Sequence, residues 1–198
     1  MPKKSGSSWQ HCPSEGSAKT CVQPIEMEKN FDELFLDFSI RKLEQLASRI
    51  GDCLGKLRED QIWAREGDNQ NAVGNLVLHL SGNVRQWITV GIGGAPDTRD
   101  RDSEFAARGG PSGAELAGGL RMTVQEAVRI LRQVSASRLK EPLRIQDYEA
   151  TILEAIYHVV EHFSQHAGQI MYATKLLTGD DLGYYRHLTG SAHKEKTP

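Results

Sequence analysis

Apolar residues that recur at steps of three and four positions constrain this chain more than any other feature of its sequence. This spacing places side chains on one face of an α-helix, whereas a half-buried β-strand needs alternation. Four segments show it, starting near Phe31, Val73, Leu116 and Ile152. Each is long enough for a helix of about 20 to 28 residues. Four amphipathic helices without a strong hairpin signal predict an all-α protein, a four-helix bundle.

The first two helices are separated by a polar stretch, and the second and third by a long loop. We expect the first helix from Phe31 to about Leu57 and the second over about residues 70–91. The loop reads GGAPDTRDRDSEFAARGGPSG, and its polar, glycine-rich composition predicts that it is not packed. Loops of this length are usually either functional or mobile.

Capping residues predict the limits of the last two helices. Ser112 with Glu115, and Thr151 with Glu154, have the spacing of capping boxes at the starts of the third and fourth helices. Between these helices we expect LRIQDYEA to be a short extended linker. Gly179 should end the fourth helix, because glycine readily adopts the left-handed conformation of a C-terminal cap.

The 198 residues of the chain suit one folded domain with tails. Residues 1–27 are rich in Ser, Gly, Lys and Pro and have no apolar periodicity. They cannot bury enough apolar surface to offset the entropy lost on ordering, so we expect a disordered or loosely ordered tail. The bundle should occupy residues 28–188, and residues 189–198 should form a polar tail.

Charge and cysteine content exclude several classes of function. The 24 Lys and Arg against 26 Asp and Glu give a net charge of −2, which provides no attractive field for a nucleic acid. No apolar segment has the length of a signal peptide or a membrane span, so we expect a cytoplasmic protein without a membrane partner. The three cysteines are an odd number at irregular spacing, which argues against a disulfide framework.

Histidines are the candidate metal ligands. At about 100° per residue, His166 falls inside the apolar stripe of the fourth helix, His162 at its edge and His158 one step further out. Side chains four positions apart lie about 6 Å apart along one face, so two imidazoles can converge on one ion. His79, at the flank of the second helix's stripe, could supply a third ligand. Three imidazoles suit zinc, nickel, copper or ferrous iron and leave positions free for water or substrate.

Spacing alone leaves other interpretations open. A histidine near an apolar face is commonly a core residue, and a metal-free bundle would need hydrogen-bond partners for all the ring nitrogens. Gln169 shares the face of the predicted ligand pair and could hydrogen-bond a ligand or a bound water, or be a packing amide. Asn83 could orient the ring of His79, or be solvated. His158 could be a proton shuttle or a partly exposed polar residue.

Further candidates have simpler explanations. Arg99 and Arg101 of the long loop could bind a carboxylate, but we interpret them as solvated charges. Glu161 points about 100° away from His162, which indicates a surface charge rather than a general base. Three aromatic residues are interpreted as packing residues: Trp63, Trp87 and Tyr185.

Two segments resemble the metal-binding segments of the DinB/YfiT-like superfamily, damage-inducible four-helix-bundle metalloproteins. They are HLSGNVRQWI around His79 and HVVEHFSQHAGQI around His162 and His166. The resemblance is to a subfamily of undefined function and extends over residues 28–188, including NAVGNLVLHL, RDRDSEF and ATKLLTGDDLGYY. Ala167 is a departure, since many members have arginine there, and this puts any role of that arginine in doubt.

The resemblance implies an antiparallel four-helix bundle with a long crossover loop, a zinc or nickel ion bound by His79, His162 and His166, and a homodimer. Characterised relatives include S-transferases and isomerases that use bacillithiol, mycothiol or glutathione. It therefore implies a metal-dependent enzyme acting on a small molecule, a low-molecular-weight-thiol S-transferase or a hydrolase. The alternative is a non-catalytic, metal-stabilised binding or stress-response module. A fourth protein ligand would favour that module, and an open position beside a pocket would favour the enzyme.

Overall fold

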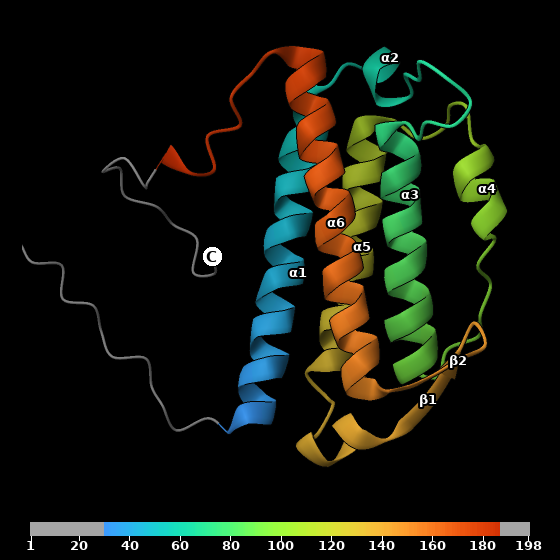
Figure 1. The fold of residues 1–198 in the computed structure, drawn as a ribbon, viewed down its shortest axis with the longest axis vertical. Helices are drawn as coiled ribbons and strands as arrows, with labels where there is room; N and C mark the ends of the chain where they lie inside the picture. Colours follow the sequence, from blue (N-terminus) through green and yellow to red (C-terminus); the bar gives the residue numbers. More distant parts are fainter. Residues whose placement is uncertain (1–29, 187–198) are drawn as a thin grey trace, which may run out of the picture.

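The computed structural model describes residues 30–186, which are predominantly helical with one small sheet (Figure 1). The tails expected at residues 1–27 and 189–198 lie outside the described residues. No helix within residues 30–186 combines the length and apolar character that a bilayer span requires. In chain order the elements are α1 (Phe31–Lys56), α2 (Glu59–Ile62), α3 (Val73–Val84), the π-helix η1 (Arg85–Ile92), α4 (Arg101–Ala106), α5 (Gly113–Leu131), the 3₁₀-helix η2 (Ala136–Lys140), β1 (Pro142–Ile145), β2 (Tyr148–Thr151) and α6 (Ile152–Thr178).

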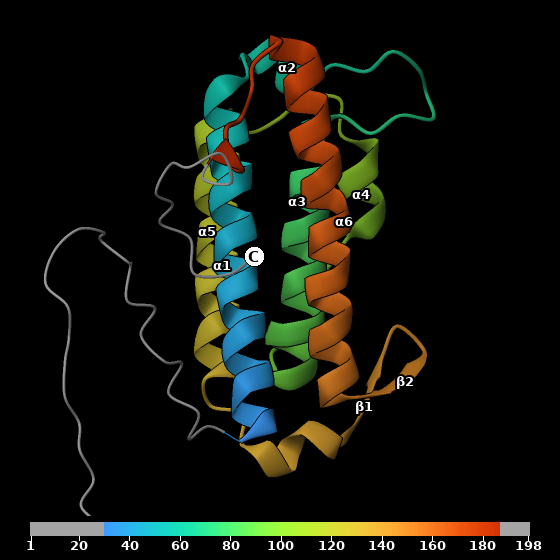
Figure 2. The same ribbon diagram turned by 60° about the vertical axis from the view of Figure 1, so that its left-hand side comes forward.

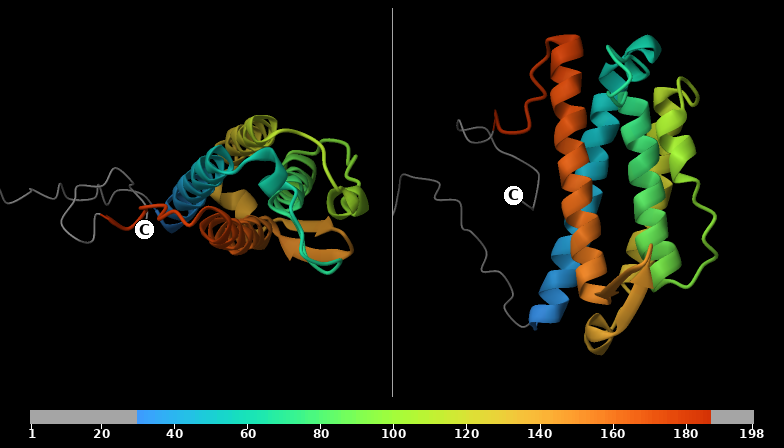
Figure 3. Two further views of the ribbon diagram at one scale, coloured as in Figure 1. Left: turned by 90° about the horizontal axis from the view of Figure 1, so that it is seen from above. Right: turned by 45° about the vertical axis from the view of Figure 1, so that its right-hand side comes forward.

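The long helices α1, α3, α5 and α6 pack around one apolar core (Figure 2). Helix α1 contacts α5 and α6, and α3 contacts the same two helices. Seen from above, the long helices surround a common centre, and α4 lies outside α3 (Figure 3). Each long helix contributes side chains that are almost fully buried, for example Leu43, Leu80, Leu120 and Phe163. The apolar periodicity therefore predicted the buried face of each long helix.

Helices α1 and α6 run in one direction, and α3 and α5 run in the other (Figure 1). The segment between η1 and α5 crosses back along the molecule and carries α4. Each long helix consequently has one parallel and one antiparallel neighbour. The arrangement is therefore only partly antiparallel, because the long crossover makes α3 and α5 run in the same direction.

The helix ends follow the predicted capping residues. The side chain of Ser112 accepts a hydrogen bond from the backbone N–H of Glu115 (3.3 Å), and that of Thr151 accepts one from Glu154 (3.2 Å). Gly179 caps α6 in the left-handed conformation, with φ of 73°. Local sequence chemistry thus determines where α5 begins and where α6 begins and ends.

The segment LRIQDYEA forms a β-hairpin, so the prediction of a linker without a hairpin was wrong. Strands β1 and β2 are antiparallel, with Ile145 opposite Tyr148. The turn residues Gln146 and Asp147 both have positive φ, 50° and 65°, which a two-residue hairpin turn of this kind requires. The signal was missed because such turns usually read Asn-Gly or Asp-Gly.

The long crossover is packed against α3, contrary to the expectation from its composition. Within it, α4 is capped by Asp100, whose side chain accepts from the N–H of Ser103 (3.1 Å). Asn75 of α3 is fully buried and donates to the backbone carbonyls of Glu104 (2.8 Å) and Ala107 (3.0 Å). The side chain of Asn75 thus holds the crossover against α3 through hydrogen bonds to its backbone. The composition of the loop does not reveal such bonds.

Two glycine substitutions test the assignment of the α6 terminus. Gly179→Ala should lower the free energy of unfolding by about 1 kcal/mol, since an L-residue is strained at positive φ. Gly118 lies inside α5, and neither glycine has an atom within 4 Å of an added Cβ. Gly118→Ala should therefore raise the free energy of unfolding by up to about 1 kcal/mol. Urea denaturation measures both, and a change of the same sign in both variants would contradict the assignment.

Candidate metal centre

His79 of α3 meets His162 and His166 of α6 where the two helices pack together. One nitrogen from each ring lies within 4.8 Å of the other two, so the group could hold a metal ion. Nε2 of His79 is 3.1 Å from Nε2 of His162. Two imidazole nitrogens bound to one tetrahedral zinc ion would be about 3.4 Å apart, given Zn–N distances of about 2.0 to 2.1 Å. The structure thus brings together the three histidines that the sequence singled out.

A carboxylate from the crossover orients His79. Nδ1 of His79 lies 3.0 Å from Oε2 of Glu104, a residue of α4. Nη2 of Arg99 lies 3.1 Å from the same nitrogen, but the ionised carboxylate can only accept, so we assign the proton to Nδ1 in the bond with Glu104. With Nδ1 protonated, the lone pair of His79 is on Nε2, which faces His162.

Arg99 is buried at the centre of a network, so its interpretation as a solvated loop charge was wrong. Only 4% of its side chain is exposed. It donates from Nε to Oε1 of Glu104 (2.7 Å), from Nη2 to Oε2 (2.8 Å) and from Nη1 to Oε1 of Gln86 (2.8 Å). Gln86 in turn donates to Asp97 (2.7 Å) and accepts from Gln146 of the hairpin turn (2.6 Å). The crossover, η1 and the hairpin are therefore joined behind His79.

Of the predicted supporting residues, Gln169 contacts a histidine of the group and Asn83 does not. Nδ1 of His166 lies 2.7 Å from Oε1 of Gln169, which can only accept, so the remaining lone pair of His166 is on Nε2. Asn83 is buried, and its Oδ1 has no partner among the described residues. Nδ1 of His162 is likewise buried without a partner.

A cavity of about 340 Å³ is lined by two histidines of the group, His79 and His162. His158 lines it but is outside the three-histidine group, as the helical phase predicted. Its ring centre lies 4.3 Å from that of Trp87, which was interpreted as a packing residue, and 5.6 Å from that of His162. The lining residues are His79, Asn83, Trp87, Arg99, Arg101, Gln146, Tyr148, His158 and His162.

The surroundings keep the imidazoles of His162 and His166 neutral and the carboxylate of Glu104 ionised. Burial, aided by the charges of neighbouring groups such as His166 and His79, lowers the pKa of His162 to about 3. Burial also lowers the pKa of His166. Burial alone would raise the pKa of Glu104, but hydrogen bonds from Arg99 and His79 hold that pKa below its ordinary value. Neutral imidazoles are the form that binds metal, so this electrostatic arrangement suits a metal site.

Glu104 is the functional residue that the sequence analysis missed. It lies in the polar loop segment RDRDSEF, where no periodicity marks it. One indirect signal was Gly82, three positions after His79 on α3, because a Cβ there would collide with Oε1 of Glu104. By contrast Glu161 is exposed and accepts a hydrogen bond from Gln165 (2.8 Å), in keeping with its interpretation as a surface charge.

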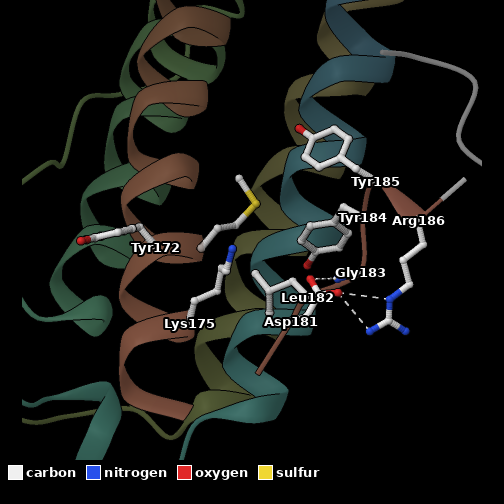
Figure 4. Close-up of a pocket in the computed structure, with 9 residues that line it drawn as sticks. Tyr172, Lys175, Asp181, Leu182, Gly183, Tyr184, Tyr185 and Arg186 are labelled. Carbon is white, nitrogen blue, oxygen red and sulfur yellow. Dashed lines mark hydrogen bonds and ion pairs between the residues drawn. The ribbon is translucent and has the colours of Figure 1, made fainter. Parts of the chain in front are cut away.

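A second pocket, of about 450 Å³, has no histidine in its lining, and Figure 4 shows the residues that line it. It lies between α6 and the segment that follows it, and its lining includes Tyr172, Lys175 and Tyr185. Asp181 accepts hydrogen bonds from Arg186 at its edge (3.2 Å). Trp63 lines neither this pocket nor the histidine cavity, and its indole donates to a backbone carbonyl instead. The three aromatic residues considered together in the sequence thus lie in three different places.

The fold and the site define a helical protein with a candidate three-histidine metal centre. The chain belongs to the DUF1572 family, described as a protein of unknown function, whose model matches residues 30–189. No curated protein matches the chain. The crystal structure of a conserved protein from Enterococcus faecalis is similar, with a TM-score of 0.61 and 17% identity over 77% of this chain and 99% of that one. At this identity the similarity shows a common fold alone.

Acidification should destabilise the metal-free protein through its buried histidines. His162 has a folded pKa of about 3, and an unfolded histidine titrates near about 6.5. Between these values the unfolded chain binds more protons, so stability falls as the pH falls. One such histidine contributes a slope of at most about 1.4 kcal/mol per pH unit. Urea denaturation with EDTA between about pH 7 and pH 4.5 should therefore give a steeper dependence for the wild type than for His162→Gln; equal slopes would contradict the burial of a neutral imidazole.

Removing the charge of Glu104 should weaken metal binding. Glu104→Gln keeps the shape of the side chain but loses the strong acceptor that fixes the His79 ring, so affinity should fall about 10 to 100-fold. Competition with a chromophoric chelator for zinc measures the affinity, and circular dichroism checks whether the fold is retained. Glu161→Gln is the matched control, because it makes the same charge change beside His162 on the exposed face of α6. Equal affinities of the two variants would exclude this role for Glu104.

Proposed function

We propose that the chain is a DinB-like four-helix-bundle protein whose His79, His162 and His166 hold one divalent ion, zinc or nickel, for catalysis. The reaction we propose is transfer to or from a low-molecular-weight thiol, with hydrolysis of a small substrate as the second reaction type. The observation that carries the proposal is the convergence of three imidazole nitrogens within 4.8 Å beside a cavity of about 340 Å³. The packing of α1, α3, α5 and α6 around one core supports the bundle.

The number of ligands favours an enzyme over a purely structural metal site. Structural zinc sites are usually closed by four protein ligands, whereas catalytic sites keep one position free. Within residues 30–186 the group contains no fourth His, Cys, Asp or Glu. The carboxylate of Glu104 is bonded to Nδ1 of His79, on the side of the ring away from Nε2. A cavity beside an open position is what a substrate would need.

Each supporting side chain has a task in this scheme. A divalent ion at the histidines would supply Lewis acidity, which lowers the pKa of a thiol or water bound to it. Glu104 holds the proton of His79 on Nδ1 and so directs Nε2 toward the ion. Arg99 keeps Glu104 ionised, and Gln169 fixes the ring of His166 by the bond at 2.7 Å. His158 lies on the cavity wall, where it could transfer a proton to or from a substrate.

The second candidate is a non-catalytic module in which the ion fastens α3 to α6. The position of the ligands on these two helices favours it, because an ion there would join segments 83 residues apart in the chain. Both candidates require the metal, and only the enzyme requires a free position. The homodimer remains a prediction from the resemblance, and it is compatible with both the enzyme and the non-catalytic module.

Alanine substitutions test the ligand set. His79→Ala, His162→Ala and His166→Ala should each purify without stoichiometric metal, because two imidazoles hold a divalent ion poorly against water. His158→Ala should retain the ion, with at most about a 10 to 100-fold loss of affinity. Elemental analysis of the purified variants measures this. Loss of metal in His158→Ala together with retention in His166→Ala would assign the pair to His158 and His162 and overturn the proposed centre.

The zinc- and nickel-loaded wild type then separates the two candidates. Consumption of bacillithiol, mycothiol or glutathione in the presence of an electrophile, or hydrolysis of an ester, should occur with the loaded protein and disappear in His162→Ala. Stoichiometric metal without turnover in any of these assays would favour the non-catalytic module.

A further inference from the structure

The cavity beside the histidines contains polar groups that a metal ion does not explain. Nε1 of Trp87, a donor, and Oδ1 of Asn83, an acceptor, have no hydrogen-bond partner among the described residues. Both side chains line the cavity, and each residue is only 5% exposed. An unsatisfied buried polar atom costs about 1 to 3 kcal/mol, so such atoms call for a partner. A polar ligand in the cavity would supply one.

The charges of the residues around the cavity indicate the charge of that ligand. None of the nine residues that line the cavity is acidic, and Arg99 and Arg101 are basic. Glu104 balances Arg99 through two hydrogen bonds, whereas Arg101 packs at 5.0 Å over the ring of Phe105. A divalent ion on three neutral imidazoles would add two positive charges that its protein ligands do not balance. The loaded cavity therefore favours an anion.

The aromatic side chains that line the cavity indicate the shape of the ligand. Trp87 of η1 lies 4.3 Å from His158 of α6 and 6.3 Å from Tyr148 of β2, measured between ring centres. These rings come from three different elements and line the same cavity. Flat, partly apolar walls favour a planar group, because offset or edge-to-face contacts between rings are favourable.

We propose that this cavity binds a small planar organic anion, such as an aromatic or conjugated carboxylate, beside the three histidines. Its anionic group takes the free position on the ion, and its planar part contacts Trp87, His158 and Tyr148. A hydrogen-bonding substituent on such an anion would be the partner of Nε1 of Trp87 or Oδ1 of Asn83. The proposal rests on the proposed metal centre and names the substrate class of that same site.

Four simple probes separate charge from shape. Benzoate is a planar anion, benzamide is its neutral counterpart, acetate lacks the ring, and cyclohexanecarboxylate has a ring that is not planar. Calorimetry with the zinc-loaded full chain should give the tightest binding for benzoate, about tenfold tighter than for benzamide and acetate. Protein treated with EDTA should bind benzoate more weakly than the loaded protein.

Matched variants locate the binding. Tyr148→Leu should weaken benzoate binding about two- to tenfold and leave acetate unchanged, because it removes a ring contact. Tyr172→Leu is the control, since Tyr172 is 66% exposed, Tyr148 is 64% exposed, and Tyr172 lines the other pocket (Figure 4). Arg101→Gln should weaken both anions, whereas Arg121→Gln, an exposed arginine on α5, should not. None of these side chains belongs to the three-histidine group, so metal content should be unchanged.

The results distinguish failure of the inference from failure of the proposed centre. Stoichiometric zinc with no preference for benzoate over acetate and benzamide overturns the planar-anion inference and leaves the metal centre standing. A benzoate affinity that is unchanged in both Tyr148→Leu and Arg101→Gln shows that benzoate binds elsewhere and also overturns it. Absence of zinc binding overturns the proposed centre and the inference together.

Discussion

The carboxylate of Glu104, held between Arg99 and His79, is the interaction on which the site depends. A buried carboxylate costs several kcal/mol unless it is paired and hydrogen-bonded, and removing one partner of such a pair costs about 3 to 5 kcal/mol. Glu104 meets this requirement through two bonds from Arg99 and one from His79. The crossover cannot leave α3 without separating Glu104 from His79. The same carboxylate therefore fixes the loop on the helices and the imidazole in its orientation.

Other residues of α3 help to position Glu104. Gly82 has no side chain at the point where Glu104 reaches the helix, and Asn75 binds the backbone of Glu104 two turns earlier. Beyond Val84 the helix widens into η1, where the N–H of Gly93 bonds to the carbonyl of Ile88, five residues back. Wider turns of this kind often occur at functional sites. Here the widened segment carries Gln86 and Trp87, which link the network behind His79 to the cavity.

The sequence predicted what depends on local periodicity and missed what depends on tertiary pairing. Helix positions, the caps at Ser112 and Thr151 and the phase of the histidines on α6 follow from spacing within one segment. The packing of the crossover and the role of Glu104 depend on pairing with α3, which leaves no periodic trace in a polar loop. The hairpin was missed for a different reason, since Gln146 is an unusual residue for a turn that needs positive φ.

The candidate metal ligands and two residues of the cavity wall lie on different elements of the fold. The three histidines lie on α3 and α6, which both contribute to the common core, so helix packing sets the positions of these candidate ligands. Arg101 and Tyr148, by contrast, lie on α4 and β2, outside the long helices. Changes there alter the cavity wall without disturbing the buried faces of the long helices, because neither side chain belongs to the core. Segments of this kind on a rigid scaffold can change ligand preference while the chemistry at the ligands stays the same. If the proposed function holds, ligand preference would therefore reside in the crossover and the hairpin, and the capacity to hold an ion in the two helices.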